Sequence, residues 1–169
     1  MTFFLIGMCY SGKTTIGKLL SQKLNKKWLD SREIFTSMFG ISENEYLIKY
    51  GKNKFQEAEQ IAMSQNFGNY IISLSGSAIY YSKQMQDIKD NHTVIWLNAS
   101  LDTILKRKSN ENYERPIVFP DGINTFNDLY NERYELYKKY HTVEINIKSS
   151  DSTDDVVQNI IDELNYKRL

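Results

Sequence analysis

The stretch from Gly7 to Thr15, with the sequence G-M-C-Y-S-G-K-T-T, constrains the fold of this chain more than any other part. It matches the pattern G-x-x-x-x-G-K-[ST] and lies between the apolar run F-F-L-I and a segment whose apolar residues have helical spacing. A glycine-rich loop between a strand and a helix lets backbone N–H groups converge on one concavity, to which the helix adds its positive end. The pattern therefore predicts a phosphate-binding loop.

Within this loop, Lys13 is expected to reach the β- and γ-phosphates of a nucleotide, and the Thr14 hydroxyl is expected to ligate Mg²⁺. The alternative is a glycine-rich turn without a ligand, which the matching strand and helix on either side make much less favourable. The predicted nucleotide contacts of the loop are Gly7, Cys9, Tyr10, Ser11, Gly12, Lys13, Thr14 and Thr15.

The composition narrows the class of protein. The 169 residues fit a single domain, 1–169, with a sizeable core. Lysine plus arginine and aspartate plus glutamate both total 21, and a zero net charge argues against a nucleic-acid partner held by bulk charge. The single cysteine excludes an internal disulfide framework, and no apolar run is long enough to span a bilayer. We expect a cytoplasmic protein without a membrane partner, since the first residues lack the features of a signal peptide.

Apolar segments and helical patterns alternate along the chain. Strands are expected at 2–7, 28–30, 70–74, 93–97 and 142–147. Helices are expected at 13–25, 31–65 with breaks near Gly40 and Gly51, about 78–88, from 100 to 108, at 124–140 and from 151 to about 166. This alternation predicts an α/β fold, a parallel sheet covered on both faces, with ligands at the carboxyl ends of the strands.

Asp30 ends a predicted strand, where its carboxylate would hold Mg²⁺ through water or accept the proton of an attacking hydroxyl. The alternative role is to cap the following helix. Residues 109–122 hold both prolines and predict a loop or short mobile lid. Arg115 in that segment is a candidate for closing over the transferring phosphate, and a solvated surface charge is the alternative.

Three further cations are left with open alternatives. Arg107 or Lys108 would lie over the adenine ring by a cation–π contact, although either would also suit the end of a helix. Arg133 lies in a helical pattern of leucines and tyrosines, where it forms either a surface ion pair or a contact inside the site. The sequence does not choose between these arrangements.

Taken in order, these segments resemble the shikimate kinase family of small P-loop kinases over nearly the whole chain. Besides the phosphate loop, the matching segments are Trp28-Leu29-Asp30 for F-x-D-x-D, Phe55-Gln56-Glu57-Ala58-Glu59 for F-R-x-x-E, Ser75-Gly76-Ser77 for G-G-G, Arg115-Pro116 for R-P, and Arg133-x-x-Leu136-Tyr137 for R-x-P-L-Y. The resemblance implies a five-stranded sheet in the order 2-3-1-4-5, ATP and Mg²⁺ as cofactors, a mobile lid, and phosphoryl transfer to a hydroxyl of a small carboxylated ring.

The resemblance also implies roles for individual residues. Lys13, Asp30 and Arg115 would be catalytic, with Thr14 and Asp30 holding the metal. Arg107 remains a candidate for the nucleotide contact from its place in the chain alone. The helical segment at about 31–65 would bind the acceptor. The substrate-binding set carried over in this way is Asp30, Arg32, Gln56, Ser75, Gly76, Ser77 and Arg133.

This chain departs from the family pattern only on the acceptor side. Arg32 replaces the second aspartate, Gln56 replaces an arginine, and Ser75 and Ser77 replace two glycines. The resemblance implies an ATP-dependent kinase acting on shikimate or a related acceptor. Because these replacements make the pocket more positive than in the family, we expect an anionic acceptor held by Arg32 together with Arg133.

Several alternatives stay open. The alternative for Arg32 is a side chain turned toward solvent. A different acceptor (a sugar, a polyol, or a nucleoside or nucleotide) is possible, as is a nucleotide-binding module without transfer activity, although simple binding needs neither Asp30 nor Arg115. We expect a monomer or weak dimer.

Overall fold

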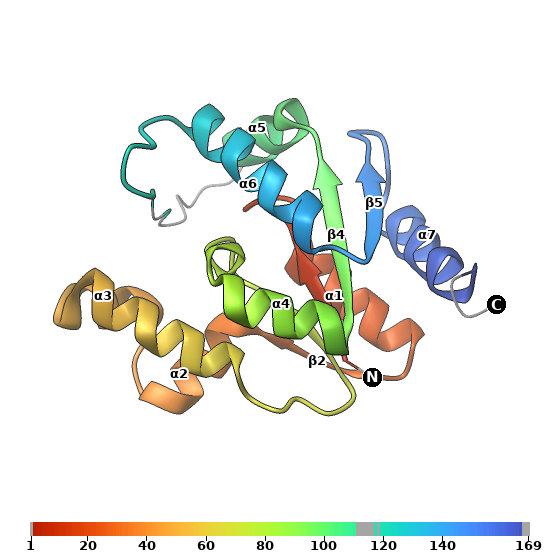
Figure 1. Cartoon of the computed structure of the whole chain (residues 1–169). Coiled ribbons are helices and arrows are strands. Elements are labelled where there is room, and N and C mark those ends of the chain that lie inside the picture. Colours follow the sequence, from red (N-terminus) through yellow and green to blue (C-terminus); the bar gives the residue numbers. More distant parts are fainter. Residues whose placement is uncertain (1, 111–116, 118, 167–169) are drawn as a thin grey trace.

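The computed structural model describes residues 2–110, 117 and 119–166, and its centre is a five-stranded parallel sheet in the order β2-β3-β1-β4-β5 (Figure 1). Each strand pairs in parallel with its neighbours in that order. The α/β class and the strand order expected from the sequence are therefore confirmed. The strands are β1 (Phe3–Ile6), β2 (Lys27–Asp30), β3 (Tyr70–Ser73), β4 (Thr93–Ala99) and β5 (Val143–Ile147).

Helices cover both faces of the sheet (Figure 1). The helix that follows the phosphate loop, α1, packs with α7 on one face, and α4 and α6 pack on the other. The short helix η1 joins the end of β3 to α4. The helices are α1 (Lys13–Lys23), α2 (Ser31–Phe39), α3 (Glu43–Met63), η1 (Ala78–Tyr80), α4 (Ser82–Asn91), α5 (Leu101–Ser109), α6 (Phe126–Tyr140) and α7 (Thr153–Tyr166).

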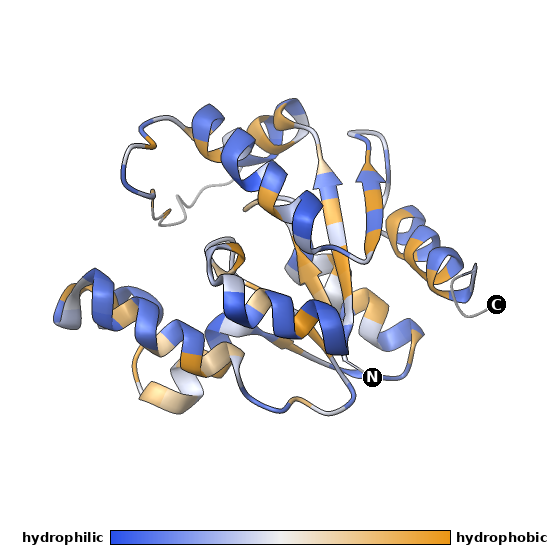
Figure 2. Ribbon diagram, viewed as in Figure 1, coloured by the Kyte–Doolittle hydropathy of each residue, from blue (hydrophilic) through white to orange (hydrophobic). Residues whose placement is uncertain are grey.

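The core lies in the central strands, which are apolar along their length (Figure 2). All four residues of β1 are buried, which explains why its sequence shows an apolar run instead of alternation. Helices α2 and α3 share a smaller apolar cluster of their own, formed by Phe35, Phe55, Ala58 and Ala62. This second cluster packs α2 against α3, and the α2–α3 segment forms one wall of the cleft described below.

Both predicted breaks in the 31–65 segment are confirmed by backbone geometry. Helix α2 ends at Gly40 in the left-handed region, with φ of 76°, and α3 is kinked at Gly51, with φ of 80°. The single helix expected at about 78–88 is instead divided into η1 and α4 at Tyr81. None of the helices in the described part of the chain combines the length and apolar composition that crossing a bilayer requires.

Candidate active site

The phosphate loop joins the carboxyl end of β1 to the start of α1, so the predicted strand–loop–helix context is confirmed. Gly7 and Gly12 have φ values of 144° and 99°, which side chains disfavour. A Cβ on Gly7 would also lie only 2.8 Å from the carbonyl oxygen of Leu97. Tyr10 takes a left-handed conformation with φ of 66°, a strained geometry that clusters at functional sites. The conformation of the loop backbone thus depends on its two glycines.

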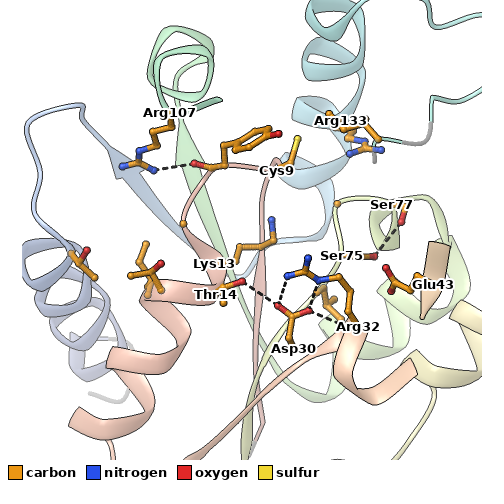
Figure 3. Close-up of a pocket in the computed structure, with 18 of the residues that line it drawn as sticks. Cys9, Lys13, Thr14, Asp30, Arg32, Glu43, Ser75, Ser77, Arg107 and Arg133 are labelled. Carbon is orange, nitrogen blue, oxygen red and sulfur yellow. Dashed lines mark hydrogen bonds and ion pairs between the residues drawn. The ribbon is translucent and has the colours of Figure 1, made fainter. Parts of the chain in front are cut away.

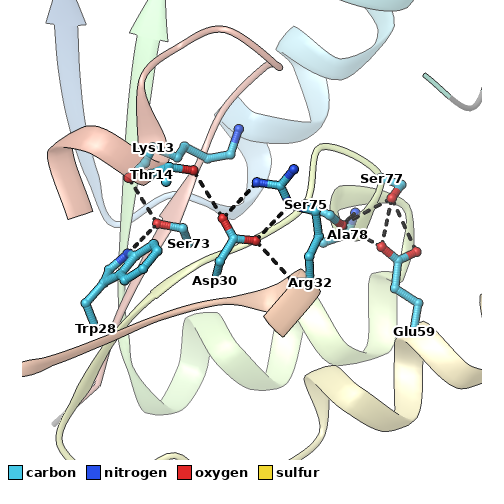
Figure 4. A network of polar contacts seen from close by, with 10 residues as sticks. All are labelled: Lys13, Thr14, Trp28, Asp30, Arg32, Glu59, Ser73, Ser75, Ser77 and Ala78. Carbon is cyan, nitrogen blue, oxygen red and sulfur yellow. Dashed lines mark hydrogen bonds and ion pairs between the residues drawn. The ribbon is translucent and has the colours of Figure 1, made fainter. Parts of the chain in front are cut away.

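Lys13 folds back over this loop. Its Nζ donates to the carbonyl oxygens of Gly7 at 2.7 Å and Met8 at 2.9 Å. The backbone of Lys13 is fixed from the sheet, since Ser73 Oγ donates to the Lys13 carbonyl at 3.0 Å and accepts from Trp28 Nε1 at 3.0 Å (Figure 4). The start of α1 is therefore anchored by side chains from β2 and β3.

Asp30 has the capping role that the sequence offered as an alternative, and it also lies beside the phosphate loop. It caps α2, accepting from the Arg32 N–H at 3.1 Å, and it also accepts from Thr14 Oγ1 at 3.1 Å (Figure 3). Burial raises the pKa of Asp30, but the hydrogen bonds and charge of Arg32, together with Thr14, outweigh it and hold the pKa below its ordinary value. Asp30 is thus an anion at neutral pH beside the phosphate loop.

Arg32 adopts an arrangement that neither sequence alternative anticipated. Its Nε donates to Asp30 Oδ1 at 3.0 Å and its Nη2 to Asp30 Oδ2 at 3.1 Å, a two-point ion pair (Figure 4). The Arg32 side chain is 51% exposed, whereas that of Asp30 is 9% exposed. The guanidinium is therefore bound to the carboxylate beside the phosphate loop, while about half of the side chain stays exposed.

A cleft of about 530 Å³ runs from the phosphate loop to the α2–α3 segment and α6 (Figure 3). Of the predicted site residues within the described part of the chain, Gly7, Ser11 and Gln56 do not line it. Ser11 is fully buried beneath the loop. Arg115 and most of the N-terminal half of the predicted 109–122 lid lie outside the described residues. The predicted residues that line the cleft are Cys9, Tyr10, Gly12, Lys13, Thr14, Thr15, Asp30, Arg32, Ser75, Gly76, Ser77, Arg107 and Arg133.

Arg107 and Lys108 face different surroundings. Arg107 Nη1 donates to the carbonyl oxygens of Tyr10 at 3.2 Å and Ser11 at 3.1 Å, and its side chain lines the cleft (Figure 3). Lys108 instead lies over the ring of Phe126, with Nζ 5.4 Å from the ring centroid. Of the two cations left open by the sequence, Arg107 is the one that reaches the nucleotide end of the cleft.

Arg133 is directed inward, not to the surface. It is 3% exposed, and its Nε donates to the Tyr80 hydroxyl at 3.3 Å, which in turn donates to Glu132 at 2.7 Å. A Cβ on Gly76 would lie 2.7 Å from Arg133 Nη1, so the absence of a side chain at Gly76 makes room for the guanidinium. Arg133 thus places a buried cation at the end of the cleft remote from Arg107 (Figure 3).

The hydroxyls of Ser75 and Ser77 donate hydrogen bonds to the buried carboxylate of Glu59, to which the sequence analysis assigned no role. Ser75 Oγ donates to Glu59 Oε1 at 2.5 Å, and Ser77 Oγ to Oε1 at 2.9 Å (Figure 4). The Tyr81 hydroxyl also donates to Glu59, which is 3% exposed. The serines line the cleft, but these hydroxyls are committed to satisfying Glu59. Its place in the F-R-x-x-E match was visible, whereas its partners lie far away in sequence.

Glu43 is a cleft residue that the sequence analysis missed. It is the first residue of α3 and lies beside Ser75 in the cleft (Figure 3). Burial, followed by the nearby charge of Glu59, raises the pKa of Glu43 to about 8, against a smaller opposing effect of Arg32. An acidic residue in the first turn of a helix is usual at the sequence level, so no local pattern marked it as a cleft residue.

Comparison with known proteins agrees with this geometry. Residues 10–165 match the family model described as Shikimate kinase. A shikimate kinase from Sulfurihydrogenibium sp. (strain YO3AOP1) is 31% identical over 137 residues, which cover 80% of this chain and 81% of the relative. The solved structure of Aquifex aeolicus shikimate kinase covers 99% of this chain and 98% of its own, with 26% identity and a TM-score of 0.79.

A second solved structure, described as shikimate kinase from Acinetobacter baumannii in complex with shikimate, has a TM-score of 0.84. It covers 99% of this chain and 94% of its own, and at 22% identity it supports the fold. The family match spans the phosphate loop from Tyr10 onward, the α2–α3 segment and α6, elements that contribute to the cleft. This chain belongs to the shikimate kinase family, and it is a P-loop phosphotransferase with an alcohol group as acceptor.

Proposed function

We propose that this chain transfers the γ-phosphate of Mg·ATP to a hydroxyl of shikimate or a closely related anionic ring. One observation carries the proposal: a single cleft joins the phosphate loop at one end to the buried cation of Arg133 at the other. The cleft therefore provides adjoining sites for a nucleotide and for a small anion. Family membership supports the same acceptor class, although the residues that depart from the family pattern lie on the acceptor side.

The loop geometry fits a nucleotide with a divalent metal. Glycines at positive φ let loop amides face the concavity, and the Thr14 hydroxyl lies 3.1 Å from the Asp30 carboxylate. Mg²⁺ is commonly held by one or two protein groups with waters and phosphates. That pattern agrees with the lack of any cluster of at least three His, Cys, Asp or Glu ligands in the described residues. When bound, Mg·ATP supplies the phosphoryl group and offsets the charge that develops on it.

The residues at the nucleotide end act by positioning and electrostatics. Lys13 is held at the loop by two carbonyl oxygens and would exchange them for phosphate oxygens. Thr14 and Asp30 would hold the metal, and Arg107 would lie along the nucleotide. Because the pKa of Asp30 is lowered, Asp30 suits an orienting or metal-binding anion better than a proton acceptor. Arg115 keeps its predicted role on the transferring phosphate.

At the other end, Arg133 would bind the carboxylate of the acceptor. A buried guanidinium oriented through Tyr80 suits two-point binding of a planar carboxylate. The missing side chain at Gly76 lets both the guanidinium and a ring approach the backbone. Ser75 and Ser77 would shape this wall with their backbone and carbon atoms, because their hydroxyls are engaged with Glu59.

The direct test is ADP release by the purified protein with Mg·ATP and a panel of acceptors: shikimate, gluconate, a polyol, and a deoxynucleoside. We expect release that depends on shikimate or on another carboxylated ring and that is lost in Lys13→Ala. Faster turnover of an uncharged acceptor would refute the acceptor class. If the nucleotide binds but no acceptor causes ADP release, the protein is a nucleotide-binding module without transfer activity.

A further inference from the structure

The Glu43 carboxyl occupies an unusual position for an ionisable group. It lines the acceptor end of the cleft, and its Oε1 is buried without a hydrogen-bond partner in the described part of the chain (Figure 3). A buried polar atom that lacks a partner costs free energy unless a ligand supplies one. Glu43 therefore calls for an explanation in terms of function or of local structure.

Local structure does not provide one. Helix α3 is already capped, since Ser42 Oγ accepts from the Glu45 N–H at 3.3 Å and Glu45 Oε2 accepts from the Ser42 N–H at 2.9 Å. This reciprocal capping box satisfies the start of the helix without Glu43. The carboxyl of Glu43 is thus available for a purpose other than ending α3.

The donors nearest to Glu43 in the cleft are directed at other carboxylates. The hydroxyls of Ser75 and Ser77 donate to Glu59, and Arg32 is bound at two points to Asp30. The cleft wall therefore presents Glu43 as an acceptor facing a space that a ligand would fill. A small molecule seated against Arg133 would extend toward this wall, because both residues line the same end of the cleft.

We propose that Glu43 is a specificity-determining residue that receives a hydrogen bond from a ring hydroxyl of the phosphoryl acceptor. The inference rests on the proposed function and names the residue that would recognise a hydroxyl group of the acceptor. Arg133 on α6 would take the anionic group, and Glu43 on α3 would take a hydroxyl. The pair selects molecules that carry both groups at a fixed separation, and it leaves a monocarboxylate without hydroxyls poorly bound.

The electrostatic surroundings of Glu43 suit a hydroxyl. Burial has the largest effect on its carboxyl and raises the pKa; Glu59 raises the pKa further, Arg32 lowers it, and Asp30 raises it slightly. Near neutral pH the carboxyl is thus largely protonated, and a hydroxyl pairs with either form because it both donates and accepts. A fixed negative charge here would instead oppose the anion that Arg133 attracts.

The test compares Glu43→Leu and Glu43→Gln with Glu57→Gln, which changes an exposed carboxylate on the same helix. We expect Glu43→Leu to raise the KM for shikimate about tenfold or more while the KM for ATP changes less than about twofold. Glu43→Gln, which keeps a hydrogen-bonding group, is expected to fall between it and the wild type. The melting temperature of ligand-free Glu43→Leu should equal or exceed that of the wild type, since a buried unpaired carboxyl is removed. Glu57→Gln should leave both KM values unchanged.

Shikimate analogues that each lack one ring hydroxyl provide the second arm. One of these analogues should bind the wild type more weakly than shikimate does. The same analogue should bind Glu43→Leu almost as well as shikimate binds that variant, because two changes that remove the same contact are not additive. An unchanged shikimate KM in an active Glu43→Leu variant, or equal losses for every analogue in both proteins, would overturn the inference alone. Failure of the wild type to release ADP with shikimate would overturn the proposed function and this inference with it.

Discussion

The two ends of the cleft are built in different ways. The nucleotide end is a contiguous loop whose backbone takes its shape from Gly7 and Gly12, and its outer wall is Arg107 from α5. The acceptor end is assembled from side chains of α2, α3, the β3–η1 connection and α6. Two of those side chains are hydrogen-bonded to carboxylates: Ser75 to Glu59 on the distant helix α3, and Arg32 to its near neighbour Asp30 at the end of β2. A site made of backbone is therefore encoded locally, whereas one made of side chains depends on contacts between distant segments.

The largest effect is expected from Lys13→Ala at the nucleotide end. Loss of a positioned cation on the transferring phosphate should lower kcat by about 10²-fold or more. The rise in melting temperature on adding Mg·ATP should shrink or vanish, since a ligand stabilises only the state that binds it. Lys83→Ala, on the exposed side of α4, is the matched control. A normal ATP-induced shift in Lys13→Ala would show that the loop does not bind phosphate as proposed.

A crossed pair of variants tests whether the two ends are separable. Arg133→Lys keeps a positive charge but loses the planar fork, so the KM for the acceptor should rise about tenfold while that for ATP changes little. Arg107→Lys should do the reverse, raising the KM for ATP alone. Melting temperatures measured alongside exclude a general loss of folding. If either variant changed both constants equally, the division into a nucleotide end and an acceptor end would fail.

The same distinction explains how much the sequence could predict. The positions of the strands, the breaks at Gly40 and Gly51 and the phosphate loop were predictable, because apolar runs, glycines and the G-K-T pattern act locally. The strand order came from the family resemblance, which the sheet confirms. The inward direction of Arg133 was not, because it depends on Gly76 from another segment leaving space for a guanidinium.

The side-chain contacts at the acceptor end were even harder to predict from the sequence. Arg32 was expected to contact an anionic ligand or solvent, and its bond to Asp30 is invisible to any pattern of charges along the chain. Glu43 was overlooked because an acid in the first turn of a helix has an ordinary explanation. For Arg32 the missing information was the direction of its side chain, and for Glu43 it was that the start of α3 faces the cleft.

The hydrogen bonds around Glu59 allow a test of intermediate size. Ser77→Ala removes one donor from a carboxylate that is 3% exposed, which should lower the free energy of unfolding by about 1–3 kcal/mol, or roughly 3–9 °C in Tm. In a Glu59→Gln background, the same change should cost measurably less. Ser64→Ala, at an exposed site on the carboxyl end of α3, is the control. Equal costs in both backgrounds would show that Ser77 does not act through Glu59.

The smallest effect is expected from Arg32→Ala, at the border between the two ends. The pKa of Asp30 in the folded protein lies below its ordinary value of 3.8, largely through Arg32, after burial has acted in the opposite direction. Such a depressed pKa stabilises the protein above pH 3.8 and loses this effect as the pH falls through the folded value. Because Arg32 is half-exposed, the wild type should exceed Arg32→Ala in stability by no more than about 1 kcal/mol at pH 7.

That difference should shrink as the pH is lowered from 5 toward 3, which Tm measurements on both proteins would show. Lys54→Ala, which breaks an exposed ion pair with Glu57, provides the matched control and should show a smaller difference at pH 7. The acceptor KM decides what Arg32 does in the cleft. An ion pair committed to Asp30 predicts a change below about threefold, whereas an Arg32 that binds the acceptor anion directly predicts about tenfold. The tenfold result would mean that Arg32 breaks its ion pair with Asp30 when the acceptor binds and pairs with the acceptor anion instead.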